Sequence, residues 1–153
     1  MSMTASGDTT ARTKQDHPHM SIERTRATMT AYLETVVDGG PVGNYLAPDA
    51  TLTMMDSGDI THGRDAIAGV IDFIHTRAFA AGMELEALVV DEGRAMIEAI
   101  FAGVHTGEFG GLAPTGRAVR VQYAVAFDLA GDAITALRVY LPLEALARQV
   151  RHG

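Results

Sequence analysis

The loop at residues 105–121, HTGEFGGLAPTGRAVRV, combines a chemically active side chain with four glycines and a proline. Its histidine, His105, can give or take a proton near neutral pH, so it could protonate a leaving oxygen or hold a carbonyl. Alternatively, His105 fastens the loop through a backbone carbonyl. The glycines permit a sharp reversal, and the Pro114-Thr115-Gly116 sequence predicts a turn. We therefore expect this loop to form the rim of a pocket.

The same loop does not fit a phosphate cradle or a metal centre. Phosphate loops lead from glycines into the N-terminus of a helix, whereas these glycines lead into the strand-like residues 117–121. His62 and His75 are 13 residues apart, and no His-x-x-x-His pair occurs in the chain. We predict no metal site, no nucleotide and no cofactor, and we expect His62 and His75 to be surface groups.

Composition narrows the class of protein further. The chain has 153 residues, 47% of them hydrophobic, which fits one domain. A net charge of -7 argues against nucleic acid or an anionic membrane as a partner. Residues 1–20 are polar and turn-prone with no apolar signal region. We predict a disordered tail over residues 1–20, a single domain over 21–153, and a cytoplasmic location.

Apolar spacing predicts the order of the secondary-structure elements. Ser21 is a good N-cap for a helix that stops at Asp38-Gly39-Gly40. The later pattern predicts a strand at 49–56, a helix at 64–80, strands at 83–90, 94–107, 118–129 and 133–141, and a tail helix at 142–153. Helices first and a strand meander later indicate an α+β fold, with the helices on one face of a curved antiparallel sheet. Such a fold leaves a conical, apolar pocket between helices and sheet.

The loop, the strand–AGD–strand segment after it, and the terminal LPLEALARQV resemble the SnoaL-like polyketide cyclases, a family of the nuclear transport factor 2 superfamily. THGRDAI at 61–67 is similar to the start of that family's third helix, and the resemblance spans residues 21–150. It implies a cone-shaped domain of secondary metabolism that acts without a cofactor. The implied reaction is aldol closure of a ring in a hydrophobic polyketide-like intermediate, in which a carboxylate removes a proton and a histidine assists.

The family's own proton-transfer pair is replaced in this chain. Its aspartate falls near Val139, and its histidine falls near Ala124 or Val125. None of these side chains can move a proton, so the chain catalyses a different reaction or none. Ring closure enforced by the shape of the pocket is one possibility, because proximity alone can supply roughly 7–11 kcal/mol.

A second resemblance supplies candidate groups. MTAYLETVVDGG at 29–40 is similar to the first helix of ketosteroid isomerases, and Tyr32 stands where their tyrosine donates to an enolate oxygen. Their aspartate base falls at Met54, and Asp56 lies two residues on, where a regular strand would point it to the same face. We expect Asp56 to be the base, with Tyr32 and His105 donating to oxygen. The alternatives are a turn aspartate and a core tyrosine whose hydroxyl reaches the rim.

Successive side chains of a strand point to opposite faces of the sheet. This alternation predicts the remaining residues of the pocket wall and the residues of the outer face of the sheet. Tyr123 would position the substrate, and the other expected wall residues are Met54, Val125, Val139, Met29 and Phe101. On the opposite face we expect Glu98 to be exposed. There, too, we expect Arg138 to make a polar contact near Ala124, Ala126 and Ala136, where small side chains would let a second copy pack as a homodimer.

Two other functions compete with a cyclase or isomerase. A non-catalytic domain that binds hydrophobic small molecules suits the apolar replacements equally well. An epoxide hydrolase, a reaction also known in this superfamily, would need an Asp-Arg-Asp relay around a water molecule. No Arg-x-Asp sequence lies on the appropriate strand, which argues against that reaction.

Overall fold

The computed structural model describes residues 21–152, so the tail predicted over residues 1–20 lies outside its described part. Helix α2 (Ile22–Asp38) begins where the sequence predicts. The Ser21 side chain accepts a hydrogen bond of 3.1 Å from the Arg24 amide, and Gly39 ends the helix in the left-handed region at φ 73°. A short 3-10 turn, η3 (Val42–Tyr45), then leads into the sheet.

Within the described residues 21–152, six strands form one sheet in the order β2-β1-β6-β5-β4-β3. The strands are β1 (Leu46–Met54), β2 (Ile60–His62), β3 (Phe79–Asp91), β4 (Arg94–His105), β5 (Ala118–Ala130) and β6 (Ala133–Tyr140). The meander from β3 to β6 is antiparallel as predicted. However, β1 pairs in parallel with β6, so the sheet is mixed. The two strands are far apart in the chain and no hairpin joins them, so their pairing need not be antiparallel.

The second helical region is shorter than predicted. Helix α3 (Arg64–Asp72) passes into a π-helical turn, η4 (Phe73–Arg77), in which the Ala78 amide donates to the Phe73 carbonyl at 2.8 Å. Strand β3 then begins at Phe79, whereas the sequence pattern predicts a helix to residue 80 and a strand from residue 83. The π turn carries His75, which belongs to the site described below.

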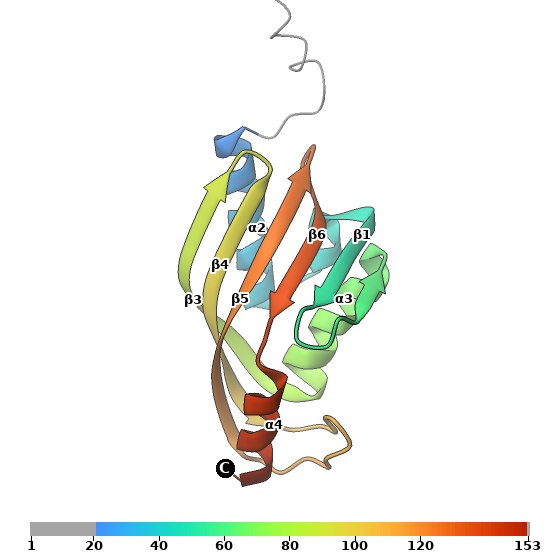
Figure 1. Cartoon of the computed structure of the whole chain (residues 1–153), viewed down its shortest axis with the longest axis vertical. Helices are drawn as coiled ribbons and strands as arrows, with labels where there is room; N and C mark the ends of the chain where they lie inside the picture. Colours follow the sequence, from blue (N-terminus) through green and yellow to red (C-terminus); the bar gives the residue numbers. More distant parts are fainter. Residues whose placement is uncertain (1–20, 153) are drawn as a thin grey trace, which may run out of the picture.

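The helices cover one face of the sheet. In Figure 1, α2 and α3 lie behind the strands, and α4 (Leu143–His152) lies at the lower end, close to β5. One buried cluster joins α2 and α3 to the sheet through side chains such as Met29, Leu33 and Ile67. A second cluster joins α4 to β4 and β5 through Leu146, Phe101 and Val121. Within residues 21–152, no helix has the length and apolar character needed to cross a membrane.

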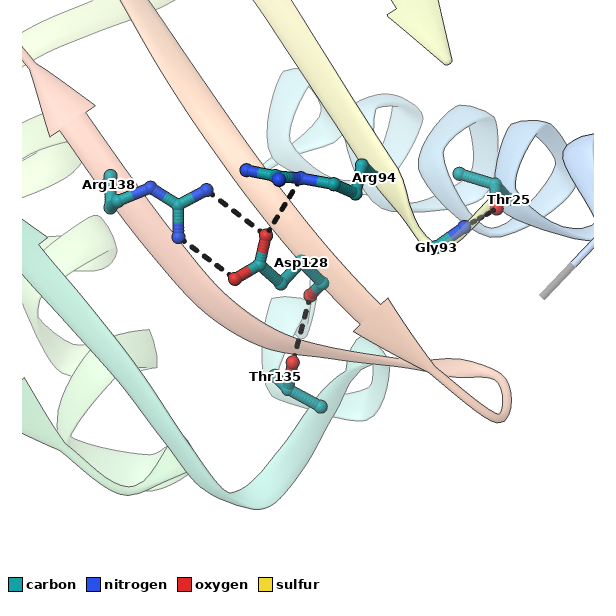
Figure 2. A network of polar contacts seen from close by, with 6 residues as sticks. All are labelled: Thr25, Gly93, Arg94, Asp128, Thr135 and Arg138. Atoms are coloured by element: carbon teal, nitrogen blue, oxygen red, sulfur yellow. Dashed lines mark hydrogen bonds and ion pairs between the residues drawn. The ribbon is translucent and has the colours of Figure 1, made fainter. Parts of the chain in front are cut away.

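The opposite face of the sheet carries polar groups. Glu98 is exposed there, as predicted. Arg138 donates two hydrogen bonds to Asp128, at 3.0 and 3.1 Å, which confirms the polar contact predicted for it, and Arg94 lies 3.4 Å from the same carboxylate (Figure 2). Figure 2 also shows the Gly93 amide donating to the Thr25 hydroxyl at 3.0 Å, which ties the start of α2 to the β3–β4 turn.

Candidate functional site

A cavity of about 230 Å³ lies between the helical layer and the sheet. Helices α2 and α3, the turn η4 and strands β1 and β3–β6 all contribute side chains to its wall, and Phe109 and Leu143 add to it from the 106–117 loop and from α4. Aliphatic and aromatic side chains make up nearly all of the wall. Among the residues that the structure describes, no Asp, Glu, Lys or Arg lines this cavity. Its polar chemistry therefore comes from Tyr32, Tyr123 and His75.

Tyr32 lies on the buried face of α2, where the apolar stripe of the helix meets the sheet. Its side chain is 4% exposed, and its ring packs edge-on against Phe127 at 5.6 Å between centroids. Burial, with a smaller contribution from Tyr123, raises the pKa of its phenol far above the usual value. The hydroxyl therefore stays protonated and can donate a hydrogen bond to an oxygen in the cavity.

Tyr123 reaches the same cavity from β5. Val125 and Phe127, two and four residues further along β5, lie on the same face of the strand and also line the cavity. The alternation of side chains along the strand predicts this placement. Burial raises the pKa of Tyr123 to about 12. The cavity therefore holds two neutral phenols, and neither hydroxyl has a hydrogen-bond partner among the described residues.

His75 lies on the cavity wall, and the prediction that it is a surface group is wrong. Its ring packs edge-on against Phe101 at 5.5 Å between centroids. Its Nδ1 is 3.0 Å from the Ile71 carbonyl oxygen. A carbonyl can only accept, so Nδ1 carries the proton and donates, and Nε2 holds a lone pair in the neutral ring. Nε2 is buried and has no hydrogen-bond partner within the part of the chain that the structure describes.

The environment of His75 favours the uncharged ring. Burial lowers the pKa of the imidazole, and this effect exceeds the opposing contributions of the Ile71 carbonyl and the Asp72 carboxylate. At neutral pH the ring is therefore uncharged, and its Nε2 is a hydrogen-bond acceptor. The sequence contains a signal for this placement, because His75 follows Ile71 by four residues and extends the apolar stripe of α3 by one turn.

Asp56 lies outside the cavity, contrary to the expected side-by-side placement with Met54. Strand β1 ends at Met54, where the chain reverses: the Ser57 and Gly58 amides both donate to the Met54 carbonyl, at 3.3 and 2.7 Å. Asp56 sits in this turn and is exposed. The prediction that the strand runs to residue 56 is therefore wrong, and the turn residues Asp56, Ser57 and Gly58 account for the reversal.

His105 fastens the loop, but it does so through Thr115 rather than through a carbonyl. The Thr115 amide donates to Nδ1 at 3.1 Å, and the Thr115 hydroxyl lies 3.0 Å from the same nitrogen. His105 is 0% exposed and packs against Phe79 at 5.3 Å between ring centroids. It is not part of the cavity wall. Phe109, which follows it in the loop, does reach the cavity, so the loop contributes to the wall through its aromatic ring.

The other side chains expected on the wall divide into two groups. Met54, Phe101, Val125 and Val139 line the cavity. Val125 and Val139 are direct partners across β5 and β6. Met29 is 0% exposed and belongs to the core cluster beneath α2, not to the wall.

The arrangement can bind a neutral molecule and hold it at an oxygen atom. Two phenols can donate and one imidazole nitrogen can accept, while the rest of the wall is apolar. A charged ligand would lose its hydration without gaining a partner of opposite charge, which is costly. Within residues 21–152, no group of three or more His, Asp or Glu side chains could hold a metal ion.

Comparisons with known proteins agree with this architecture. A family model described as SnoaL-like polyketide cyclase matches residues 26–150. No curated protein sequence matches the chain.

The structure is similar to several crystal structures. A protein described as a SnoaL-like polyketide cyclase from Jannaschia sp. CCS1 has a TM-score of 0.77 at 17% identity, over 86% of this chain and 94% of that one. A protein described as a polyketide cyclase from Silicibacter sp. TM1040 has a TM-score of 0.75 at 18% identity, over 86% of this chain and 98% of that one. A protein from Catenulispora acidiphila with a ketosteroid isomerase-like fold, in complex with trimethylamine, has a TM-score of 0.66 at 22% identity, over 81% and 92%. At these identities the likeness establishes the fold.

Proposed function

This chain belongs to the SnoaL-like polyketide cyclase family, and from that premise we propose that it is a cofactor-free cyclase or isomerase of secondary metabolism. Its substrate would be a neutral, hydrophobic, polyketide-like carbonyl compound bound in the cavity between helices and sheet. The observation that carries this proposal is the cavity itself, which is apolar except for two phenols and one imidazole.

The size of the cavity limits the substrate. Pockets for drug-sized ligands have volumes of roughly 300–1,000 Å³, whereas this cavity measures about 230 Å³. A compact monocyclic or bicyclic molecule suits this space better than an extended multi-ring one. Met54 and Met83 on the wall can adapt to an irregular ligand because their side chains are flexible.

In this proposal, Tyr32 and Tyr123 bind the carbonyl oxygen of the substrate. Their raised pKa values keep both hydroxyls protonated, so they donate hydrogen bonds to the oxygen as negative charge develops on it during enolisation. The low polarity of the wall strengthens such hydrogen bonds, because no water competes for the donors. Tyr32 thus keeps the donor role that the sequence suggests for it, while Asp56 and His105 have structural roles in a turn and a loop.

Two alternatives remain as outcomes of the test. A binding domain would hold hydrophobic ligands and return them unchanged. A shape-enforced cyclase would close rings without help from the tyrosines. An epoxide hydrolase receives no support from the site, because the described part of the wall contains neither an aspartate nor an arginine.

The test measures binding and turnover in the same protein. β-Naphthol serves as the binding probe, since it is a neutral aromatic enol, and its dissociation constant is measured by NMR titration. Val139→Phe fills the cavity and is expected to weaken β-naphthol binding at least about tenfold, as about 1.4 kcal/mol of lost binding would do. Tyr140→Phe is the matched control, because Tyr140 is the next residue of β6 and is 45% exposed.

Turnover is measured with a hydrophobic diketone that can close a ring by aldol condensation. The proposal predicts ring closure by the wild type, and a reduced rate when Tyr32→Phe and Tyr123→Phe are combined. Failure of β-naphthol to bind the wild type, or equal binding by wild type and Val139→Phe, would refute the proposed site. Binding without turnover would identify a binding domain instead.

A further inference from the structure

Resting on the proposed function, we propose that His75 is the proton-transferring residue of the cavity. Its Nε2 would take a proton from the carbon next to a substrate carbonyl whose oxygen is bound by Tyr32 or Tyr123. The substrate class is therefore a neutral, hydrophobic ketone with an acidic C–H bond in the α position.

The hydrogen bond at Nδ1 of His75 determines the protonation of Nε2, the other nitrogen of the ring. Nδ1 donates to the Ile71 carbonyl at 3.0 Å, which fixes the tautomer and leaves the lone pair on Nε2. This bond also orients the ring, as does the edge-on contact with Phe101. A base held in one tautomer and one orientation needs no rearrangement before it accepts a proton.

The missing partner of Nε2 points to a ligand. A buried polar atom without a hydrogen bond destabilises the folded protein, and Nε2 is such an atom, among the described residues, in a side chain that lines the cavity. An acidic C–H or enol O–H of a bound molecule would supply the missing donor. His105 Nε2 is also buried without a partner in residues 21–152, but His105 does not line the cavity, so the same argument does not apply to it.

The other ionisable groups around His75 are compatible with this role. Asp72, in the same helical segment, favours the protonated ring electrostatically, but burial outweighs it. Tyr32 and Tyr123 share the cavity and remain neutral. No charged side chain of the described wall competes for the proton.

The proposed step balances without an oxidant or reductant. The proton of the α carbon passes to Nε2 and gives an imidazolium ion, while the C–H electron pair forms an enolate whose oxygen accepts a hydrogen bond from a tyrosine. In an isomerase, the imidazolium returns the proton to another carbon of the same enolate. In a cyclase, the enolate carbon bonds to a second carbonyl carbon of the substrate, and the imidazolium gives its proton to the oxygen of that carbonyl.

The experiment follows exchange of α hydrogens for deuterium in β-tetralone, a hydrophobic ketone with acidic α hydrogens, by NMR in deuterated buffer. We expect the wild type to accelerate exchange over buffer. Because positioned acid–base groups contribute about 10²–10⁴-fold, His75→Gln should reduce the protein-dependent rate at least about 100-fold. His62→Gln is the matched control, since His62 is exposed on β2, and it should exchange like the wild type.

The outcomes separate this inference from the proposed function. If β-naphthol binds and β-tetralone exchanges equally fast with wild type and His75→Gln, or if the wild type binds β-naphthol but gives no exchange, the role of His75 is overturned while the binding site stands. If β-naphthol fails to bind the wild type, the proposed function itself fails.

A spectroscopic measurement on the wild type keeps the inference testable should His75→Gln not fold. The ¹⁵N chemical shift of His75 Nε2 reports directly on its lone pair. We expect an unprotonated Nε2 that shifts when β-naphthol is added, because the naphthol hydroxyl donates to it. A protonated Nε2, or an Nε2 signal that does not change with β-naphthol, would overturn the proposal.

Discussion

Lowering the pH should destabilise this protein through His75, and the effect has a defined sign and upper limit. Burial lowers the pKa of His75 in the folded state below the value of 6.5 that it has when exposed. Between pH 6.5 and the lower pKa of the folded state, the unfolded chain therefore binds a proton at His75 that the folded chain does not bind. The free energy of unfolding rises with pH wherever the unfolded state binds more protons. His75 should accordingly remove stability as the pH falls through 6.5 towards its folded pKa.

The magnitude follows from the protonation of the unfolded state alone. At about one pH unit below the unfolded pKa, that protonation stabilises the unfolded chain by about 1.4 kcal/mol, provided that the folded pKa is lower still. The loss between about pH 8 and about pH 5.5 is therefore at most about 1.4 kcal/mol for this single group. The measurements stop at about pH 5.5 because the pI of the protein is near 5.2. Near its pI the protein would carry little net charge, which promotes association and precipitation.

The assay is urea unfolding followed by far-ultraviolet circular dichroism, at closely spaced pH values, for wild type, His75→Gln and His62→Gln. Other ionisable groups are the same in wild type and His75→Gln, so the difference between these two proteins isolates the contribution of His75. His62→Gln is the control for the same exchange at an exposed position. Identical slopes for wild type and His75→Gln, or a wild type that loses less stability than His75→Gln on acidification, would refute the reasoning.

Further predictions concern the sheet. Asp128→Asn should cost up to about 1 kcal/mol of stability at neutral pH, since the pair with Arg138 is partly exposed. Hydrogen bonding by Arg138 lowers the Asp128 pKa from 3.8, so this difference from wild type in urea unfolding should shrink as the pH falls below that value; an undiminished difference would contradict the assignment. Gly103→Ala should cost about 1–3 kcal/mol, because the new Cβ would overlap the Ala80 carbonyl oxygen. Gly82→Ala, with no atom within 4 Å of the new Cβ, should change thermal stability little; equal losses in both variants would show that the overlap is not the cause.

Most helices and strands could be predicted from the sequence because apolar residues recur about every 3.6 residues in helices and every two residues in strands. Alternation over residues 118–129 predicts β5, and Ser21 with Gly39 predicts both ends of α2. The parallel pairing of β1 with β6 was not predictable in the same way, since it depends on a contact between segments about 85 residues apart in the chain. Local patterns carry no information about which strand edge such a segment reaches.

The candidate site was only partly predictable. Tyr32 and Tyr123 reach the cavity because a helical stripe and a strand face point them there, and both periods are visible in the sequence. His75 was misplaced because a polar residue at the end of an apolar stripe suggests a surface position, although its spacing from Ile71 indicated the opposite. Asp56 was misplaced because one more alternating residue suggested a continuing strand, whereas Ser57 and Gly58 already terminate it.

The scarcity of polar groups on the cavity wall has a consequence for how ligand choice could evolve. The described wall offers no charged group to a ligand, so the cavity can distinguish related molecules mainly by shape. The Val, Leu, Ile, Met and Phe side chains of the wall determine that shape. In such a pocket, one methylene group more or less is worth roughly 1–3 kcal/mol, or about 10–200-fold in preference. Single exchanges among aliphatic residues would therefore redirect the protein to a new ligand while the two phenols and the imidazole stay in place.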